Sequence, residues 1–228
     1  MIPTAAQKIP AAGKRNRRLV RACGWLAAGV LFGSVLQAAD SRSDNVFAWP
    51  AMLPPNLQRV AVLPLAAESP DADLPEGCEA LRPVLLDELV RTKKFEVVSV
   101  NPESLRGSSG RAAWTGAEEL PAGFFDSLRR EYGCDAVLFC QLTVYHAYAP
   151  LAVGWRLKLA DVHTHQILWA ADEIFDAGHP SVSRNAWQFL SRRDKSTTAD
   201  ASRWAAANSP RQFGRYTAAE VLGRLPER

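Results

Sequence analysis

The sequence of 228 residues has few of the residues that mark several special classes of protein. Only 14 glycines and 15 prolines are present, too few for a collagen-like or low-complexity chain. The 4 cysteines and 4 histidines form no CxxC pair and no Cys/His spacing typical of a zinc site. Hydrophobic residues make up 47% and charged residues 22% of the chain. These ordinary values exclude disorder over most of the length and predict a folded protein.

Acidic residues are absent from residues 1–39, and the pattern of this segment is typical of an export signal. Six basic residues precede an apolar run at 22–36, and the small residues Ala38 and Ala39 follow it. This order predicts a secretory signal peptide that is cleaved after Ala38 or Ala39. The apolar run has about 15 residues, whereas a membrane-spanning helix needs about 20. An uncleaved inner-membrane anchor formed by residues 22–39 is the alternative.

The net charge of the protein depends on this segment. The whole chain has 27 basic and 24 acidic residues, for a formal charge of +3. Removal of residues 1–39 takes away six basic residues and leaves 21 against 24 acidic ones, a net charge of −3. Because nucleic acids attract basic surfaces, we expect no nucleic-acid partner. We expect a periplasmic protein that contacts a membrane only through an uncleaved N-terminus.

Three cysteines remain beyond the predicted signal: Cys78, Cys134 and Cys140. Export allows a disulfide, because the compartment is oxidising. Cys134 and Cys140 are six residues apart along a predicted strand, which separates them by about 20 Å and excludes a bond between them. Cys78 paired with either Cys134 or Cys140 stays open. The alternative is three buried, unreactive thiols.

Hydrophobic periodicity predicts one α/β domain at residues 58–228, after an irregular lead-in at 40–57. The expected strands cover 59–65, 95–100, 135–148, 152–161 and 166–177. The expected helices cover 76–92, 117–132, a short segment after Pro180, and a last segment from Pro210 to Leu222. Residues 101–116 and 194–208 are predicted loops. The first strand, helix and second strand form a parallel unit, and a later hairpin makes the sheet mixed. We expect a mixed sheet of about five strands flanked by helices.

Three sets of residues in this order resemble a bacterial envelope family. They are Val60–Leu65 at the start of the domain, Lys94–Val98 after the first helix, and Leu157–Asp161 followed by Thr164 and Ile167–Trp169. These residues are similar to strand and hairpin signatures of the CsgG-like group. The lipoprotein LpoB and the N-terminal domain of TolB share the fold of that group. The resemblance implies a periplasmic protein of the cell envelope.

The sequence departs from this family in ways that bear on function. The resemblance covers residues 58–225, but the chain has no lipobox cysteine and no following propeller. No pair of strands has the alternation and length expected of the transmembrane hairpins of an export pore. His165 stands where relatives often carry glycine in the hairpin turn, and the turn is expected to need a positive φ. A stand-alone binding or assembly domain is therefore favoured over a secretion channel.

The hairpin turn holds the candidate metal ligands His163, His165 and Asp161. Two spaced histidines near a carboxylate can bind a metal, but a complete site needs further ligands and support. A small metal-dependent hydrolase or metal-binding protein that uses this turn is the alternative function. No HExxH, GxSxG or phosphate-binding loop accompanies these residues. Histidines exposed at a turn are the simpler interpretation.

Three tryptophans lie in or near predicted loops and the short helix: Trp114, Trp187 and Trp204. Exposed aromatic side chains at such places can anchor a partner protein. The alternative is ordinary packing in the interior, which we also expect for Trp155 and Trp169 on predicted strands.

These observations favour a non-enzymatic periplasmic protein-interaction module without a cofactor. The module would act in envelope assembly, secretion or peptidoglycan synthesis. The expected partners are proteins of the envelope or the outer membrane, and the protein could also form a homo-oligomer. A sheet edge and the loops at 101–116 and 194–208 are the expected contact regions.

Overall fold

The computed structural model describes residues 45–70, 73–193 and 209–228. The predicted signal at 1–39, the predicted loop at 194–208 and Trp204 lie outside these residues. Within the described part, no helix is long and apolar enough to cross a membrane.

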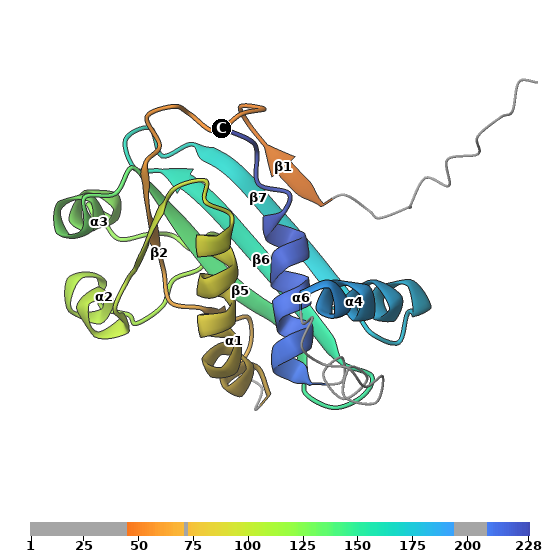
Figure 1. The fold of residues 1–228 in the computed structure, drawn as a ribbon. Coiled ribbons are helices and arrows are strands. Elements are labelled where there is room, and N and C mark those ends of the chain that lie inside the picture. Colours follow the sequence, from red (N-terminus) through yellow and green to blue (C-terminus); the bar gives the residue numbers. More distant parts are fainter. Residues whose placement is uncertain (1–44, 71–72, 194–208) are drawn as a thin grey trace, which may run out of the picture. The chain divides into compact units, whose positions relative to one another are not determined.

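One mixed sheet of seven strands organises the domain (Figure 1). The strands are β1 (Val46–Ala48), β2 (Arg59–Val62), β3 (Ala66–Ala67), β4 (Glu96–Ser99), β5 (Ala136–His146), β6 (Ala152–Asp161) and β7 (Ile167–Asp176). Their order is β1-β7-β6-β5-β2-β4, with β3 beside β5. Strands β2, β3, β4 and β5 pair in parallel, and β5, β6, β7 and β1 pair antiparallel. The predicted α/β class and mixed sheet are confirmed, with two short strands beyond the expected five.

Five helices among the described residues cover the sheet unequally. They are α1 (Asp73–Arg91), α2 (Pro102–Ser109), α3 (Phe124–Tyr132), α4 (Pro180–Arg193) and α6 (Pro210–Leu222). In Figure 1, α1, α6 and α4 lie together in front of the sheet, which we call its first face, while α2 and α3 lie to one side. Helices α2 and α3 pack on the opposite, second face, over β2 and β5.

The larger core lies between the first face and the helices α1 and α6. Trp155 and Trp169 are fully buried there, as their positions on strands predict. The Trp155 indole N–H donates to Thr217 Oγ1 at 2.9 Å, and that of Trp169 donates to the Arg224 carbonyl at 3.1 Å. These bonds satisfy the polar end of each ring and join the sheet to α6 and the residues after it.

The smaller core lies between the second face and α2 and α3. Phe124 of α3 stacks on Phe139 of β5 with ring centroids 6.2 Å apart. Trp114 meets Phe124 edge to face at 5.8 Å and is only 7% exposed. The prediction of Trp114 as an exposed partner anchor is therefore wrong, because its ring is part of this core.

The segment 101–116, predicted as a loop, contains helix α2. Asn101 caps it, because its side-chain oxygen accepts a hydrogen bond from the Glu103 N–H at 2.8 Å. Pro102 occupies the first turn, and Gly110 ends the helix with a φ of 83°. These are standard start and stop signals of a helix. The loop prediction missed them because helix α2 is polar and has one buried residue, Leu105.

Two other boundaries differ from the sequence prediction. Helix α3 begins at Phe124 and not at 117, since Pro121 and Gly123, with a φ of 73°, precede it.

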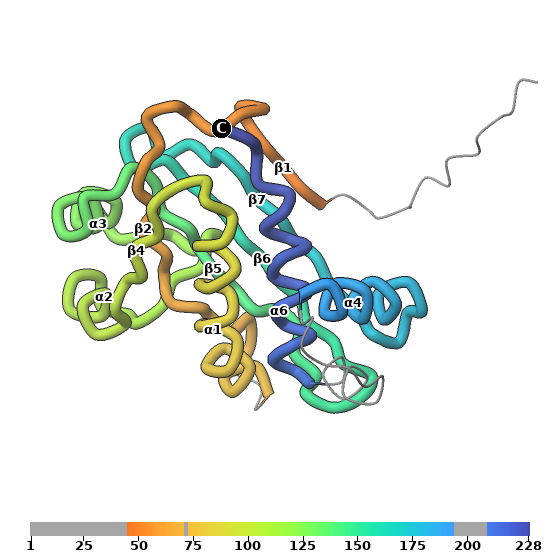
Figure 2. Tube along the Cα trace, in the orientation of Figure 1, coloured from red at the N-terminus to blue at the C-terminus, as the bar shows by residue number. Residues whose placement is uncertain are grey.

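The described part of the lead-in is not irregular throughout: strand β1 pairs with β7 at the sheet edge. A bridge between Met52 and Glu227 then joins the lead-in to the C-terminal end of the chain, which lies near β1 in Figure 2.

The three described cysteines are free and buried. Cys78 and Cys140 belong to the core of the first face, and Cys134 belongs to the core of the second face. The pairing of Cys78 with Cys134 or Cys140 is thus not formed, and the alternative of three buried thiols holds. Burial raises the pKa of Cys78 to about 11.

Candidate functional site: an open sheet face and its pocket

Part of the second face, over β7 and β1, has no helix over it within the described residues. Side chains alternate along β6, so that Trp155 and Leu157 enter the first core while Arg156 and Lys158 point to the second face. The neighbouring strands continue this surface in register. We call it the open face, and its residues are Phe47, Arg156, Lys158, Ala170, Asp172 and Ile174. Ile174 is 63% exposed and Phe47 is 52% exposed.

A row of polar side chains crosses the open face at right angles to the strands. Gln141 of β5 pairs with Arg156 of β6, which pairs with Asp172 of β7. The Arg156 Nε–H donates to Asp172 Oδ2 and its Nη1–H donates to Glu68 Oε1, both at 2.6 Å. Asp172 and then Glu68 raise the pKa of Arg156, because both carboxylates favour the charged guanidinium. The cation is therefore held in place by two partners.

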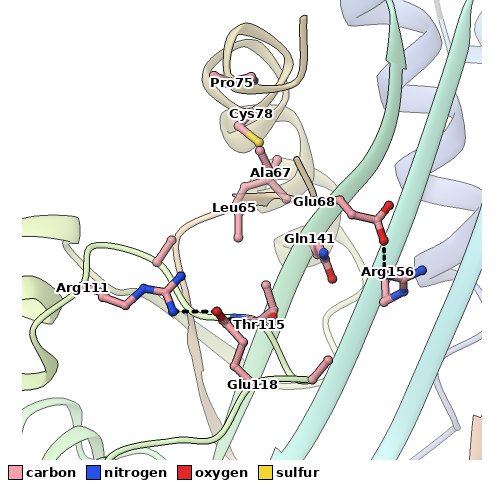
Figure 3. A pocket seen from close by; sticks show the side chains of 13 residues that line it. Leu65, Ala67, Glu68, Pro75, Cys78, Arg111, Thr115, Glu118, Gln141 and Arg156 are labelled. Carbon is pink, nitrogen blue, oxygen red and sulfur yellow. Dashed lines mark hydrogen bonds and ion pairs between the residues drawn. The ribbon is translucent and has the colours of Figure 1, made fainter. Parts of the chain in front are cut away.

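A pocket of about 680 Å³ lies between this polar row and the segment 111–118, which connects α2 to α3 (Figure 3). It begins where β2 ends and the chain passes through β3 into α1. Its lining residues are Leu65, Ala66, Ala67, Glu68, Pro75, Cys78, Arg111, Ala113, Thr115, Ala117, Glu118, Gln141 and Arg156. The volume lies in the range of ligand sites, about 300 to 1,000 Å³.

The wall from residues 111–118 holds a second charged pair. Arg111 Nη1 donates to Glu118 Oε1 at 2.6 Å, and Glu118 Oε2 accepts from the Thr115 N–H at 2.8 Å. Partial burial opposes ionisation of Glu118, but the hydrogen bonds from Thr115 and Arg111 outweigh it and lower the pKa of this carboxyl. The Arg111 guanidinium also lies 4.7 Å from the Trp114 ring centroid. Trp114 thus supports the pocket wall from the core.

Gln141 is the buried polar side chain of the pocket. It is 8% exposed, and its side chain points into the pocket (Figure 3). No described residue hydrogen-bonds to its amide. Arg156 lines both the pocket and a shallower groove of about 410 Å³ along β1, so the two hollows meet at this residue.

The candidate metal ligands of the hairpin turn are engaged in other contacts. Asp161 Oδ1 accepts hydrogen bonds from the backbone N–H of His163 at 2.7 Å and of Thr164 at 2.8 Å. His165 has a φ of 60°, as the turn predicts, and its ring stacks on Phe125 with centroids 4.6 Å apart. Within the described ranges, no group of three or more His, Cys, Asp or Glu side chains could hold a metal ion. The structure thus explains these residues as parts of the turn.

The tryptophan predictions have separate outcomes. Trp114 is buried, Trp187 is half-buried on α4, and Trp204 lies outside the described residues. The pocket residues themselves were not predicted as a site. The one sequence signal was the change to polar residues at Gln141 and Thr143 on one face of the predicted strand. The arrangement provides paired charges, an amide and an apolar wall, which suits binding through hydrogen bonds and shape.

The sequence matches no protein-family model and no curated protein. Several solved structures are similar in fold. PelC of Paraburkholderia phytofirmans, solved as a dodecamer, has 15% identity and a TM-score of 0.44, over 80% of this chain and 96% of that chain. The lipoprotein GNA1162 of Neisseria meningitidis has 20% identity and a TM-score of 0.38, over 61% and 99%.

The C-terminal domain of LpoB from Salmonella enterica has 19% identity and a TM-score of 0.32, over 52% of this chain and 82% of that chain. Similarities at these identities and TM-scores say nothing about the activity or the partners of this chain.

Proposed function

We propose that this chain is a non-enzymatic, exported protein of the bacterial envelope that acts by binding another envelope protein through its open face. The observation that carries the proposal is the uncovered part of the second sheet face. Two large apolar side chains, Ile174 and Phe47, are more than half exposed there. Export to the periplasm is proposed from the signal pattern of residues 1–39.

The composition of the open face supports a protein partner. Protein interfaces typically combine an apolar centre with polar residues and hydrogen bonds at the rim. Ile174 and Phe47 provide apolar surface on either side of the charged row formed by Arg156 and Asp172. The ion pair between Arg156 and Asp172 is already formed, so a partner meets a pre-ordered surface and less side-chain entropy is lost on binding.

Site-specific photo-crosslinking in living cells tests this function. A photoreactive amino acid at Ile174 would report contacts of the open face, and one at Val90 is the matched control. Val90 is 57% exposed on α1, on the other side of the sheet. We expect Ile174 to crosslink to one reproducible envelope protein, identified from the crosslinked peptides, and Val90 to give none.

A second substitution on the same face makes the result specific. Phe47→Asp places a charge on the open face without touching Ile174, and it should reduce the crosslinked product at least fivefold. The proposal would be contradicted by equal amounts of crosslinked product at Ile174 and Val90, or by an amount at Ile174 that Phe47→Asp does not change. Crosslinks between copies of this chain would identify the partner as a homo-oligomer.

A further inference from the structure

We propose that the pocket beside the open face binds an uncharged peptide segment and that the Gln141 amide hydrogen-bonds to a backbone amide of that segment. The proposal rests on the proposed function, since the segment would belong to the protein bound at the open face. Beyond the proposed function, it assigns a second binding site, the chemical class of its ligand and a residue that recognises the ligand.

The charges of the pocket favour a neutral ligand. Its two guanidinium groups, Arg111 and Arg156, are each paired at 2.6 Å with a carboxylate of the wall, Glu118 or Glu68. The four charges that line the pocket sum to zero, and Asp172, outside the lining, is also paired with Arg156. An anionic or cationic ligand would have to compete with one of these partners, whereas a neutral ligand leaves both pairs intact.

The Gln141 amide points to a ligand because it faces the pocket and has no hydrogen-bond partner among the described residues. An amide in this position can hydrogen-bond to water or to a ligand that replaces the water. Gln141 lies on β5 between Phe139, which is in the core, and Thr143. An aliphatic residue would satisfy folding at this position. Residues that break a local folding rule are often functional.

The chemistry of the amide matches a peptide unit. The Gln141 side chain offers both an N–H donor and a carbonyl acceptor, as a backbone amide does. The rest of the wall provides small apolar contacts from Leu65, Ala66, Pro75 and Ala113. A carbohydrate also offers donors and acceptors, but no aromatic ring lines the described pocket against which a sugar could stack. A peptide segment is therefore the better fit.

The position of the pocket allows a partner on the open face to reach it. Arg156 lines both the pocket and the groove along β1. A chain that lies over β6 and β7 would thus pass Arg156 and enter the pocket beside Gln141. The two sites would be filled by neighbouring parts of one partner, which increases the affinity of both.

Side-chain amide NMR signals of the exported, purified protein test the ligand class. The two NH₂ proton signals of Gln141 are assigned as the pair that is absent from the spectrum of Gln141→Leu. The NH₂ signals of Gln188, which is exposed on α4, are the internal control. The probes are N-acetylalanine N-methylamide as a neutral peptide unit, glucose and acetate. We expect the peptide unit alone to shift the Gln141 signal saturably in the millimolar range, without a shift at Gln188. A larger response to glucose or acetate, or no response, would overturn the proposal.

Two variants separate binding from folding. Gln141→Leu removes the amide at similar size, and we expect an unchanged or higher melting temperature with at least fivefold weaker binding of the peptide unit. Ala117→Trp adds a bulky ring at the exposed rim of the pocket and should weaken binding equally while Gln141 is intact. Unchanged binding in either folded variant would refute the site.

Failure of the pocket proposal can be told from failure of the proposed function. If Ile174 crosslinks to an envelope protein while the peptide unit does not bind to the parent protein, the open face is an interface and the pocket is not its peptide site. If neither signal is found, both proposals fall.

Discussion

Glu88 of α1 accepts a hydrogen bond from Arg193 of α4 at 2.8 Å, although the Glu88 side chain is only 3% exposed. Arg215 of α6 lies 3.6 Å from its other oxygen. One buried carboxylate therefore connects the three helices of the first face. A charge buried in this way depends on its partners, and the partners depend on it.

Glu88→Ala should lower the free energy of unfolding by about 3 kcal/mol, because it leaves two partly buried guanidinium groups without their carboxylate. Chemical denaturation measures the loss. Glu103→Ala is the matched control, since Glu103 pairs with Arg106 on the exposed surface of α2 and should cost at most about 1 kcal/mol. Equal effects of the two substitutions would show that the buried pair does not join the helices.

Gly214→Ala and Gly107→Ala should change stability in opposite directions. A Cβ at Gly214 would overlap Leu81 Cδ2 at the contact of α6 with α1, and such overpacking costs about 1–3 kcal/mol. Gly107 lies in exposed α2 with no atom within 4 Å of the added Cβ, so alanine should stabilise the helix by about 0.5–1 kcal/mol. Thermal unfolding of both variants checks the signs. A neutral Gly214→Ala would mean that α1 and α6 approach less closely than described.

The sequence predicted elements with strong periodicity better than short polar ones. Strand β6 at 152–161 and helix α6 at 210–222 have the predicted bounds, because alternation and a Ser-Pro start are local signals. Strand β1 has three residues and depends on pairing with β7, so no local pattern indicates it. The φ of His165 was predictable because it follows from the turn.

The pocket was not predictable from local patterns. Glu68, Arg111, Gln141 and Arg156 come from four separate segments, and only the sheet order and the path of the chain after α2 bring them together. Each residue has an ordinary local role in the sequence. Gln141 can be recognised as a pocket residue only after the segment 111–118 is placed beside β5.

The three buried cysteines should react slowly with alkylating agents. Burial, and then the neighbouring Glu79, raise the pKa of Cys78 from 9.0 to about 11. This shift lowers the thiolate fraction at pH 8 about 100-fold relative to an ordinary thiol. We expect iodoacetamide to label Cys78 at least 100-fold more slowly in the folded than in the unfolded protein, with a rate that rises as the pH approaches 11. Mass spectrometry of timed samples measures it, and rapid labelling at pH 8 would contradict the buried position.

His165 should tolerate glycine better than alanine. Both substitutions remove the stacking on Phe125, which is worth about 0.5–1.5 kcal/mol. Only glycine also relieves the positive φ of 60°, since a side chain in this region costs about 1 kcal/mol. Chemical denaturation should therefore give His165→Gly a free energy of unfolding about 1 kcal/mol higher than that of His165→Ala.

His163→Ala is the control for this turn, because His163 is exposed and has no positive φ. Its stability should stay within about 0.5 kcal/mol of the parent protein. If the turn instead holds a metal, both His163→Ala and His165→Gly would lower the metal content of the purified protein, and a chelator would shift the unfolding of the parent. If His163→Ala is instead as stable as the parent protein and a chelator has no effect, the backbone conformation is the reason for the difference between glycine and alanine at His165.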